Sequence, residues 1–415
     1  MTATAPFISL LSNIVDNRGR TCPTADRGLP LIATNCVKNT TLYPVLEKVR
    51  YVDQQTYSTW FRGHPLPGDL IFVCKGSPGQ VCITPDPVNF CIAQDMVAVR
   101  ADPTKIYPPY LFAALRSDEV QNAIVNMQVG TLIPHFKKGD FDKLEIPLPD
   151  ERTQNFIGDM YLSLTEKIEL NRRMNETLEG MAQAVFRDWF VDFGPVRRKV
   201  AGEADPVAIM GGLTPDPTRA AELTALFPAA FGGDGLPVGW SLRTVQSIME
   251  LAYGKSLPKT VRKDGPFPVY GSGGISGMHS VALVRGPGII VGRKGTVGSL
   301  YWEASDFFAI DTVFYVVPKD GVSLNFVWHL LQTLGLEGMN TDAAVPGLNR
   351  GNAYRLEFAC GSSRLLEAFE AFAGPLRARQ NASNSETQTL VETRDYLLPR
   401  LMSGAVRVAP HVEVA

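Results

Sequence analysis

The sequence predicts an α+β fold in which two mixed α/β globules stand in tandem, each followed by a long helix. Three observations predict this arrangement: an internal repeat of slightly over 210 residues, strand-and-turn patterns within each copy, and a long helical segment after each copy. Helices of this length need a partner, so we expect the two to pack as an antiparallel coiled coil. The predicted parts are globule 1 (1–150), helix (151–193), linker (194–235), globule 2 (236–361), helix (362–405) and tail (406–415).

The repeat consists of short matches that occur in the same order in both halves. The offset between partners falls from 220 to 216 to 212 along the chain, as loop deletions would produce. No single match is significant by itself, and the consistent order of the matches is the evidence for a repeat. The alternative is that the two halves are unrelated β-rich domains whose matches arose by chance. The matched segments are 67–71 with 287–291, Lys75-Gly76 with Lys294-Gly295, 94–97 with 310–313, 110–112 with 326–328, 133–136 with 345–348, Gly139 with Gly351, and Leu144-Glu145 with Leu356-Glu357.

Within each copy, apolar and β-branched runs after turns predict short strands, for example at 70–73, 289–291 and 310–317. Aliphatic residues three and four apart predict helices at 107–127 and 324–339.

The segment from Glu151 onward has no proline for 40 residues, and its apolar positions recur every three or four residues as in a helix–helix seam. A helix of this length would run about 60 Å, and Gly194-Pro195 is expected to end it. Adding 212 to each seam position gives a second seam that is also apolar at its ends and polar in its middle. The seam positions are Ile157, Met160, Leu164, Ile168, Asn171, Asn175, Leu178, Ala182, Val185 and Trp189, then Phe369, Phe372, Leu376, Gln380, Ser383, Thr387, Leu390, Arg394, Leu397 and Leu401.

Polar seam residues favour one register over others. Gly374-Pro375 is expected to break the second helix near its start. The linker at 194–235 is rich in Pro, Gly and Ala and predicts either a flexible segment or one that wraps the helix end. A surface helix plus a C-terminal dimerisation helix is the alternative to paired helices.

Composition narrows the functional classes. The net charge of -2 weighs mildly against nucleic-acid binding, although a basic face can hide within such a total. The six cysteines form no CxxC pair, and histidine is too scarce to complete a zinc site, so we expect no metal and reduced thiols. Because the chain shows neither a signal peptide nor a long apolar run, a soluble cytoplasmic protein is expected.

The sequence contains only incomplete matches to catalytic motifs. Tyr107-Pro108-Pro109-Tyr110 resembles the Asn/Asp-Pro-Pro-Tyr tetrad of adenine methyltransferases, but its first residue is a tyrosine, whereas an amide or carboxylate must accept from the adenine amino group there. The glycine-rich segments 271–277 and 292–298 lack the features of a phosphate-binding loop and predict turns. We therefore predict no catalytic residue in this chain.

Basic residues beside glycines are candidates for DNA contact, because donors on flexible loops can reach bases and phosphates. Lys75 and the pair Arg293-Lys294 are the strongest of them, since they occupy the same place in the repeat. Scattered surface charge is the alternative for each residue alone. The candidates are Lys38, Arg62, Lys75, Lys137 and Lys138 in the first half, and Lys255, Lys259, Arg262, Lys263, Arg293, Lys294 and Arg350 in the second.

Four strings make the chain resemble the specificity (S) subunit of Type I restriction–modification systems over nearly its whole length. They lie at 167–179, 186–193, 236–240 and 394–404. The last two read LPVGW and RDYLLPRLMSG. The first globule has no opening match to LPVGW, which indicates a shorter N-terminus.

The resemblance implies that each globule is a target-recognition domain for one half of a split, asymmetric DNA site. It implies that the paired helices set the unspecified gap and that two methyltransferase subunits dock on the chain. It also allows two restriction subunits that translocate and cut DNA. S-adenosylmethionine, ATP and Mg²⁺ would belong to those partners, which supply adenine-N6 methylation and ATP-dependent cleavage, and none to this non-catalytic chain. A coiled-coil DNA-binding scaffold without methyltransferase partners, and an enzyme acting alone, are the alternatives. The DNA sequence recognised does not follow from the amino-acid sequence.

Overall fold

The computed structural model describes residues 3–407 except 18, 20, 131–133, 320 and 341–346. The chain divides into two compact units: unit 1 comprises 1–173 with 383–415, and unit 2 comprises 174–382. Each unit therefore contains one globule together with a stretch of each long helix. The repeat matches at Ile133, Val345 and Pro346 and the end of the tail lie outside the described residues.

Unit 1 is built on a four-stranded sheet of order β2-β8-β5-β6, which packs with a three-stranded sheet of order β4-β3-β7 and a two-stranded pair β1-β9. The central strand β5 (Leu70–Val73) is buried at every position because its alternate side chains enter different hydrophobic clusters, Leu70 and Phe72 in one and Ile71 and Val73 in the other. The other strands of unit 1 are β1 (Thr4–Pro6), β2 (Leu11–Val15), β3 (Leu29–Ile32), β4 (Arg50–Val52), β6 (Val81–Ile83), β7 (Cys91–Ile92), β8 (Met96–Ala101) and β9 (Glu145–Pro147).

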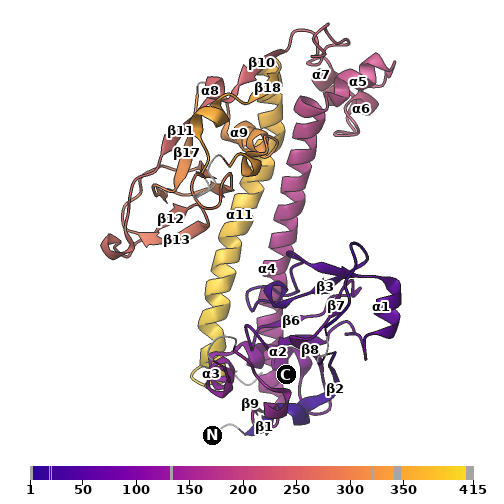
Figure 1. The fold of residues 1–415 in the computed structure, drawn as a ribbon, viewed down its shortest axis with the longest axis vertical. Coiled ribbons are helices and arrows are strands. Elements are labelled where there is room, and N and C mark those ends of the chain that lie inside the picture. The colour runs from indigo at the N-terminus through magenta and orange to yellow at the C-terminus, as the bar shows by residue number, and fades with distance from the viewer. Residues whose placement is uncertain are drawn as a thin grey trace, which may run out of the picture. The chain divides into compact units, whose positions relative to one another are not determined.

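Unit 2 repeats these strand orders: a four-stranded sheet β11-β17-β14-β15, a three-stranded sheet β13-β12-β16 and a pair β10-β18. Figure 1 labels the neighbouring strands β11 and β17, β12 and β13, and β10 and β18 of this unit. This shared topology is what the internal repeat predicts. The strands are β10 (Ser241–Thr244), β11 (Met249–Tyr253), β12 (Phe267–Gly271), β13 (Gly274–His279), β14 (Gly288–Gly292), β15 (Leu300–Glu303), β16 (Phe308–Ala309), β17 (Val313–Pro318) and β18 (Glu357–Cys360).

The α-helices of the chain are α1 (Gln54–Thr59), α2 (Pro108–Arg116), α3 (Asp118–Met127), α4 (Glu151–Phe186), α5 (Gly194–Val200), α6 (Pro206–Ile209), α7 (Pro217–Thr224), α8 (Val245–Ile248), α9 (Leu324–Leu331), α10 (Arg350–Tyr354) and α11 (Ser363–Met402). The single helix predicted at 107–127 is two helices, because Ser117 ends α2 and its Oγ accepts from Val120 N to cap α3. The helix predicted at 324–339 ends at Leu331. None of the helices, over the described residues, is long and apolar enough to cross a membrane.

The long helices α4 and α11 pack against each other, and within each unit the pairing is antiparallel. In unit 1, Asn171 Nδ2 donates to Glu386 Oε2 at 2.8 Å and lies 3.4 Å from the carbonyl oxygen of Ser383. In unit 2, Gln380 Nε2 donates to the carbonyl oxygen of Asn175 at 3.0 Å, and the rings of Phe186 and Phe369 lie 5.4 Å apart. In each stretch the residue numbers rise on α4 as they fall on α11.

All twenty seam positions are buried or half-buried. The expected break at Gly374-Pro375 is wrong, since α11 runs through both residues without interruption. The Pro375 ring is exposed, and the turns on either side are held by packing at Phe369 and by Gln380. Tertiary contacts therefore outweigh the hydrogen bond that proline cannot make.

The segment predicted as a linker is ordered and belongs to the core of unit 2. After α4 a π-helical turn, Arg187–Val191, leads to Phe193, whose φ of 53° places it in the left-handed region. Helix α5 then begins at Gly194, where the helix was expected to stop. Val196 and Phe227 of this segment are buried in one cluster with Trp189. Of the two alternatives, residues 194–235 therefore wrap the end of the helix and do not form a flexible linker.

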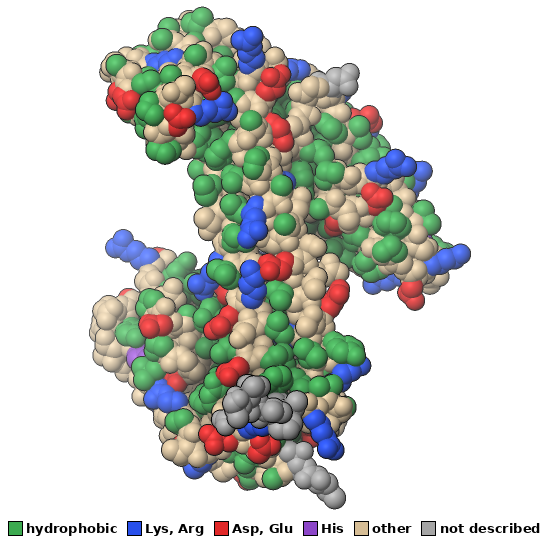
Figure 2. Space-filling view, turned by 180° about the vertical axis from the view of Figure 1, so that it is seen from behind, with side chains coloured by type: hydrophobic (Ala, Val, Ile, Leu, Met, Phe, Trp, Pro, Cys, Tyr) green, Lys and Arg blue, Asp and Glu red, His purple; other side chains and the backbone are tan. Residues whose placement is uncertain are grey.

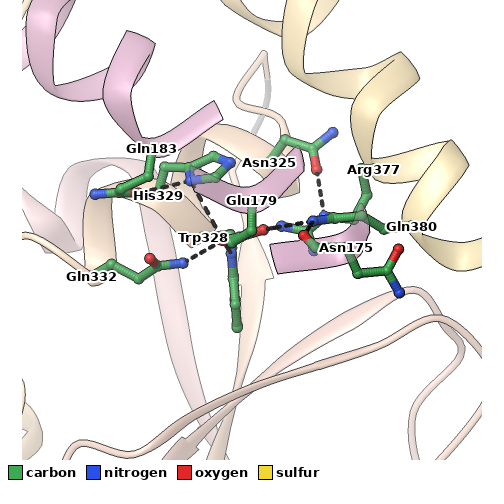
Figure 3. A network of polar contacts seen from close by, with 9 residues as sticks. All are labelled: Asn175, Glu179, Gln183, Asn325, Trp328, His329, Gln332, Arg377 and Gln380. Atoms are coloured by element: carbon green, nitrogen blue, oxygen red, sulfur yellow. Dashed lines mark hydrogen bonds and ion pairs between the residues drawn. The ribbon is translucent and has the colours of Figure 1, made fainter. Parts of the chain in front are cut away.

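A buried polar network joins α9 to α4 and α11 within unit 2 (Figure 3). Glu179 of α4 accepts from Trp328 Nε1 of α9 at 2.5 Å and from Nε2 of Gln332, the residue that follows α9, at 2.9 Å. Its other carboxylate oxygen lies 3.0 Å from Arg377 Nη2 of α11. His329 Nδ1 lies 2.8 Å from Gln183 Oε1. The network fixes α9, and with it the globule, against both long helices.

Candidate nucleic-acid interface

Both units place a basic loop at the same point of the repeat. In unit 1 the amide of Lys75 donates to Asp95 O at 3.1 Å, and in unit 2 the amide of Lys294 donates to Thr312 O at 3.0 Å. The next residue in each loop, Gly76 or Gly295, has a φ of 87°, a left-handed conformation that favours glycine. The repeat thus reproduces the loop backbone, and the exposed lysine stands at its tip in both copies.

Each loop borders a groove. The unit 2 groove, about 780 Å³ in volume, is lined by Gln246, Tyr253, Arg293, Lys294, Phe314, Gly347, Leu348, Asn349, Arg350, Gly351 and Tyr354. It brings together three of the predicted contact residues: Arg293 and Lys294 follow β14, and Arg350 begins α10. Tyr253 of β11 and Phe314 of β17 also line it.

Two arginines stack on the ring of Tyr253 in the unit 2 groove. The guanidinium carbon of Arg350 is 4.6 Å from the centroid of that ring, and that of Arg293 is 4.9 Å away. Arg293 also stacks on Phe314 at 5.7 Å, and Arg350 on Tyr354 at 5.7 Å. The Tyr253 side chain remains 47% exposed, so the stack is open to a ligand.

Backbone hydrogen bonds hold the two guanidiniums. Arg293 Nη1 donates to Asp311 O at 3.1 Å, and Arg350 Nη1 donates more weakly to Leu251 O at 3.4 Å. Within the part of the chain that the structure describes, no carboxylate forms an ion pair with either arginine. The groove therefore carries positive charge that the described side chains do not neutralise.

The unit 1 groove, about 570 Å³ in volume, is lined by Asp16, Gly19, Thr21, Lys75, Gln94, Asp95, His135, Lys137 and Lys138. It too brings together three predicted contact residues, here all lysines. Lys138 Nζ lies 3.3 Å from Asp16 Oδ2, so part of its charge is neutralised. Arg62 reaches the same region, where its Nη1 donates to Asp16 O at 3.3 Å.

The remaining predicted contact residues do not line either groove. Lys38 pairs with Glu47 at 3.2 Å. Arg262 donates to the carbonyl oxygen of Ser276 at 2.8 Å and so braces its own loop. Lys255, Lys259 and Lys263 are exposed on the connection between β11 and β12. Figure 2 shows Lys and Arg in small groups among acidic side chains, and no continuous basic surface on the face drawn.

Sequence reasoning missed the residues of the grooves that are not basic, above all Tyr253, Tyr354, Gln94 and His135. No local pattern distinguishes Tyr253 from a tyrosine that fills a core. Its partners Arg293 and Arg350 lie far along the chain, and only the sheet and the loop after β14 bring the three together.

The segments that resemble catalytic motifs have structural roles. Tyr107 Oη donates to Asp159 Oδ1 at 2.7 Å, and the buried Tyr110 Oη donates to Pro147 O at 2.8 Å. The segment 271–277 runs from the end of β12 into β13. All six cysteines are buried thiols. Over the described ranges, no three His, Cys, Asp or Glu side chains gather as metal ligands would.

Comparison with known proteins agrees with this architecture. Residues 29–180 match the family model of the Type I restriction modification DNA specificity domain. The chain is 25% identical over 403 residues to the Type I restriction enzyme HindI specificity subunit of Haemophilus influenzae, covering 82% of this chain and 86% of that protein. It is 27% identical over 367 residues to the MjaIX specificity subunit of Methanocaldococcus jannaschii, covering 82% and 78%.

A solved structure gives the same fold. The S subunit of a Type I restriction–modification system from M. genitalium aligns with a TM-score of 0.56 at 18% identity, over 97% of this chain and 96% of that one. The fold therefore defines a protein of two tandem mixed α/β domains joined by long paired helices. Over most of its length the chain is similar to the specificity (S) subunits of Type I restriction–modification systems, and its residues 29–180 match their DNA specificity domain.

Proposed function

We propose that this chain binds double-stranded DNA at a split, asymmetric site, with the globules at 1–150 and 236–361 each reading one half. The observation that carries the proposal is the pair of grooves beside Lys75 and Lys294, which stand at the same point of the repeat. Lys and Arg supply the phosphate contacts that position a protein on DNA. Two copies of one binding element on one chain suit a site of two halves.

The helices at 151–193 and 362–405 would serve as the spacer that sets the gap between the halves. Their antiparallel pairing supports this role, because paired helices resist bending better than a flexible linker of similar length. Polar seam residues such as Asn171 and Gln380 support it further, since they form hydrogen bonds in the observed register.

The chain would act inside a larger complex. Two methyltransferase subunits would dock on it and bring S-adenosylmethionine, and two restriction subunits would bring ATP, Mg²⁺, translocation and cleavage. The names of the relatives, which are specificity subunits of Type I restriction enzymes, support this assignment. In this scheme the chain selects the sequence and its partners perform the chemistry.

The test is to co-express the chain with the methyltransferase subunit encoded beside it and to map methylated adenines in the host DNA. Two short specific blocks around a fixed gap are the expected result. An unsplit motif would mean that only one globule reads DNA. A stable complex without methylation, or no complex at all, would contradict the proposal and favour a scaffold. A chain with Lys38→Ala is the control, because Lys38 lies outside both grooves and should leave the motif unchanged.

A further inference from the structure

The two grooves differ in the chemistry that they offer to DNA. The unit 1 groove presents lysines, whereas the unit 2 groove presents two arginines stacked on one exposed tyrosine. We propose that the Arg293–Tyr253–Arg350 stack is the base-reading element of unit 2 and that it recognises guanine in the half-site of that unit. This inference rests on the proposed function and narrows it to named residues and one base.

Guanine is the base that a guanidinium recognises best. Its O6 and N7 atoms are two adjacent acceptors on the major-groove edge, and the planar fork of arginine can donate to both at once. The fit requires the guanidinium to be held in one orientation. Ring stacking on Tyr253 and one backbone hydrogen bond restrict both Arg293 and Arg350 before any ligand arrives. Less rotamer freedom is therefore lost on binding.

Other arginines show what a structural guanidinium does in this chain. Arg377 also stacks on aromatic rings, at 4.4 Å from Trp302, but it pairs with Glu179 at 3.0 Å. Arg198 forms a two-pronged pair with Asp188 at 2.7 and 3.0 Å. These guanidiniums donate their N–H groups to carboxylates within the fold.

Arg293 and Arg350 differ from that pattern. Among the residues that the structure describes, neither pairs with a carboxylate, although both stack on one ring and lie in one groove. Two like charges held close together oppose each other unless a ligand rich in acceptors joins them. Guanine edges between phosphates meet this requirement, and each guanidinium has further N–H groups, beyond its one backbone bond to a described residue, that would donate to them.

In unit 1 the position equivalent to Arg293 is the buried Cys74, because Lys75 corresponds to Lys294. The basic residues that line the unit 1 groove are all lysines, each a point charge on a flexible stem. Lysine can contact a phosphate without distinguishing between bases. The unit 1 groove also contains Asp16 and Asp95, which lower its positive charge. The two half-sites should therefore be read by different chemistry, and the arginine contribution should fall on one half only.

The experiment compares Arg293→Lys and Arg350→Lys in the full chain, purified with its methyltransferase subunits. Lysine keeps the charge and loses the two-pronged donor. Binding is measured to duplexes carrying the mapped motif and to duplexes in which each G·C pair is replaced singly by A·T. The wild-type complex should bind a replaced duplex roughly 5- to 150-fold more weakly. At least one lysine variant should lose that discrimination at one G·C pair and keep it at every other.

Arg262→Lys is the matched control, because Arg262 lies in the same unit, braces a loop and does not line the groove. It should keep every preference. A second measurement is the salt dependence of binding, which should not change in the lysine variants because the number of positive charges is preserved.

Two outcomes would overturn the inference while leaving the proposed function intact. One is a split motif in which neither half contains a G·C pair that the wild type distinguishes. The other is full discrimination at every pair in both lysine variants, which would reduce Arg293 and Arg350 to phosphate contacts. Failure of the proposed function looks different, because then the wild type itself shows no split motif.

Discussion

Glu179 and Arg377 form an ion pair of 3.0 Å between α4 and α11, and the same carboxylate accepts from Trp328 of α9. Although burial alone would raise it, the Arg377 charge and the hydrogen bonds from Gln332 and Trp328 hold the pKa of Glu179 below its usual value. The Glu179 side chain thus joins α4, α9 and α11 of unit 2, so its removal should weaken the packing of all three helices.

Replacing Glu179 by Gln should destabilise unit 2 by about 2–3 kcal/mol, because it removes the carboxylate that pairs with the largely buried Arg377 charge. The double variant Glu179→Met with Arg377→Met should lose less than Glu179→Gln alone. Urea unfolding followed by tryptophan fluorescence measures the effect, since four of the five tryptophans lie in unit 2. Glu222→Gln is the control, because the exposed pair of Glu222 with Arg219 should contribute almost nothing. Equal losses in both single variants would contradict this account.

Unit 2 should lose stability as the pH falls from about 6.5 toward 4. Burial lowers the pKa of His329 to about 4, partly offset by Glu179, so the unfolded chain binds a proton in this window and the folded chain does not. Stability from such a group is fully present above its unfolded pKa and decreases as the pH drops. Glu179, whose pKa is also lowered, acts in the same direction at the acid end.

The measurement for His329 is the unfolding free energy at several pH values for the wild type and for His329→Leu. The variant should show a shallower decline between pH 6.5 and 4.5, because it has no group to protonate there. Only the difference between the two curves is informative, since carboxylates elsewhere titrate in both. Parallel curves would show that His329 does not contribute to the acid sensitivity.

Replacing Pro375 by Ala should stabilise unit 2, by about 1–3 kcal/mol. Proline inside a helix lacks one backbone hydrogen bond and crowds the preceding turn, and here it lies within the uninterrupted α11. The readout is the midpoint of urea unfolding. Pro217→Ala serves as the comparison: Pro217 occupies the first turn of α7, where proline is favourable, so its loss should give no gain. A decrease in stability at Pro375→Ala would mean that its ring is needed for packing.

Lengthening both long helices by one heptad should widen the gap in the methylated motif by about three base pairs, at about 1.5 Å per helical residue and 3.4 Å per base pair. Seven residues would be inserted between Arg173 and Met174 and seven between Ala382 and Ser383, which preserves the antiparallel pairing. Methylation mapping reads out the gap. Insertion into α4 alone should instead disrupt the pairing and abolish methylation. An unchanged gap in the double insertion would exclude the spacer role.

Lys75→Ala and Lys294→Ala should each reduce the slope of log affinity against log salt concentration by about one, the effect of losing one phosphate contact. Neither should change the bases in the motif. Binding measured over a range of salt concentrations gives the slope. Lys38→Ala is the control, because Lys38 is paired with Glu47 and lies outside the grooves. A comparable reduction of the slope in Lys38→Ala would show that Lys75 and Lys294 contribute no more to DNA binding than a lysine outside the grooves.

The sequence by itself determined the repeat, the mixed α/β class and the two long helices. These features rest on local periodicity: alternate residues of a strand and every third or fourth residue of a helix share a face whatever surrounds them. For this reason the seam positions on both long helices are all buried or half-buried, as their spacing predicts. The same spacing also identifies the polar residues in the middle of each seam.

Only the tertiary structure decided which side chains meet. Tyr253 contacts Arg293 and Arg350 because β11, the loop after β14 and the start of α10 converge, and no local pattern encodes that convergence. Helix α11 continues through Pro375 because packing on both sides compensates for the lost hydrogen bond. Periodicity fixes the face that a residue occupies, whereas its partners depend on contacts between segments far apart in the chain.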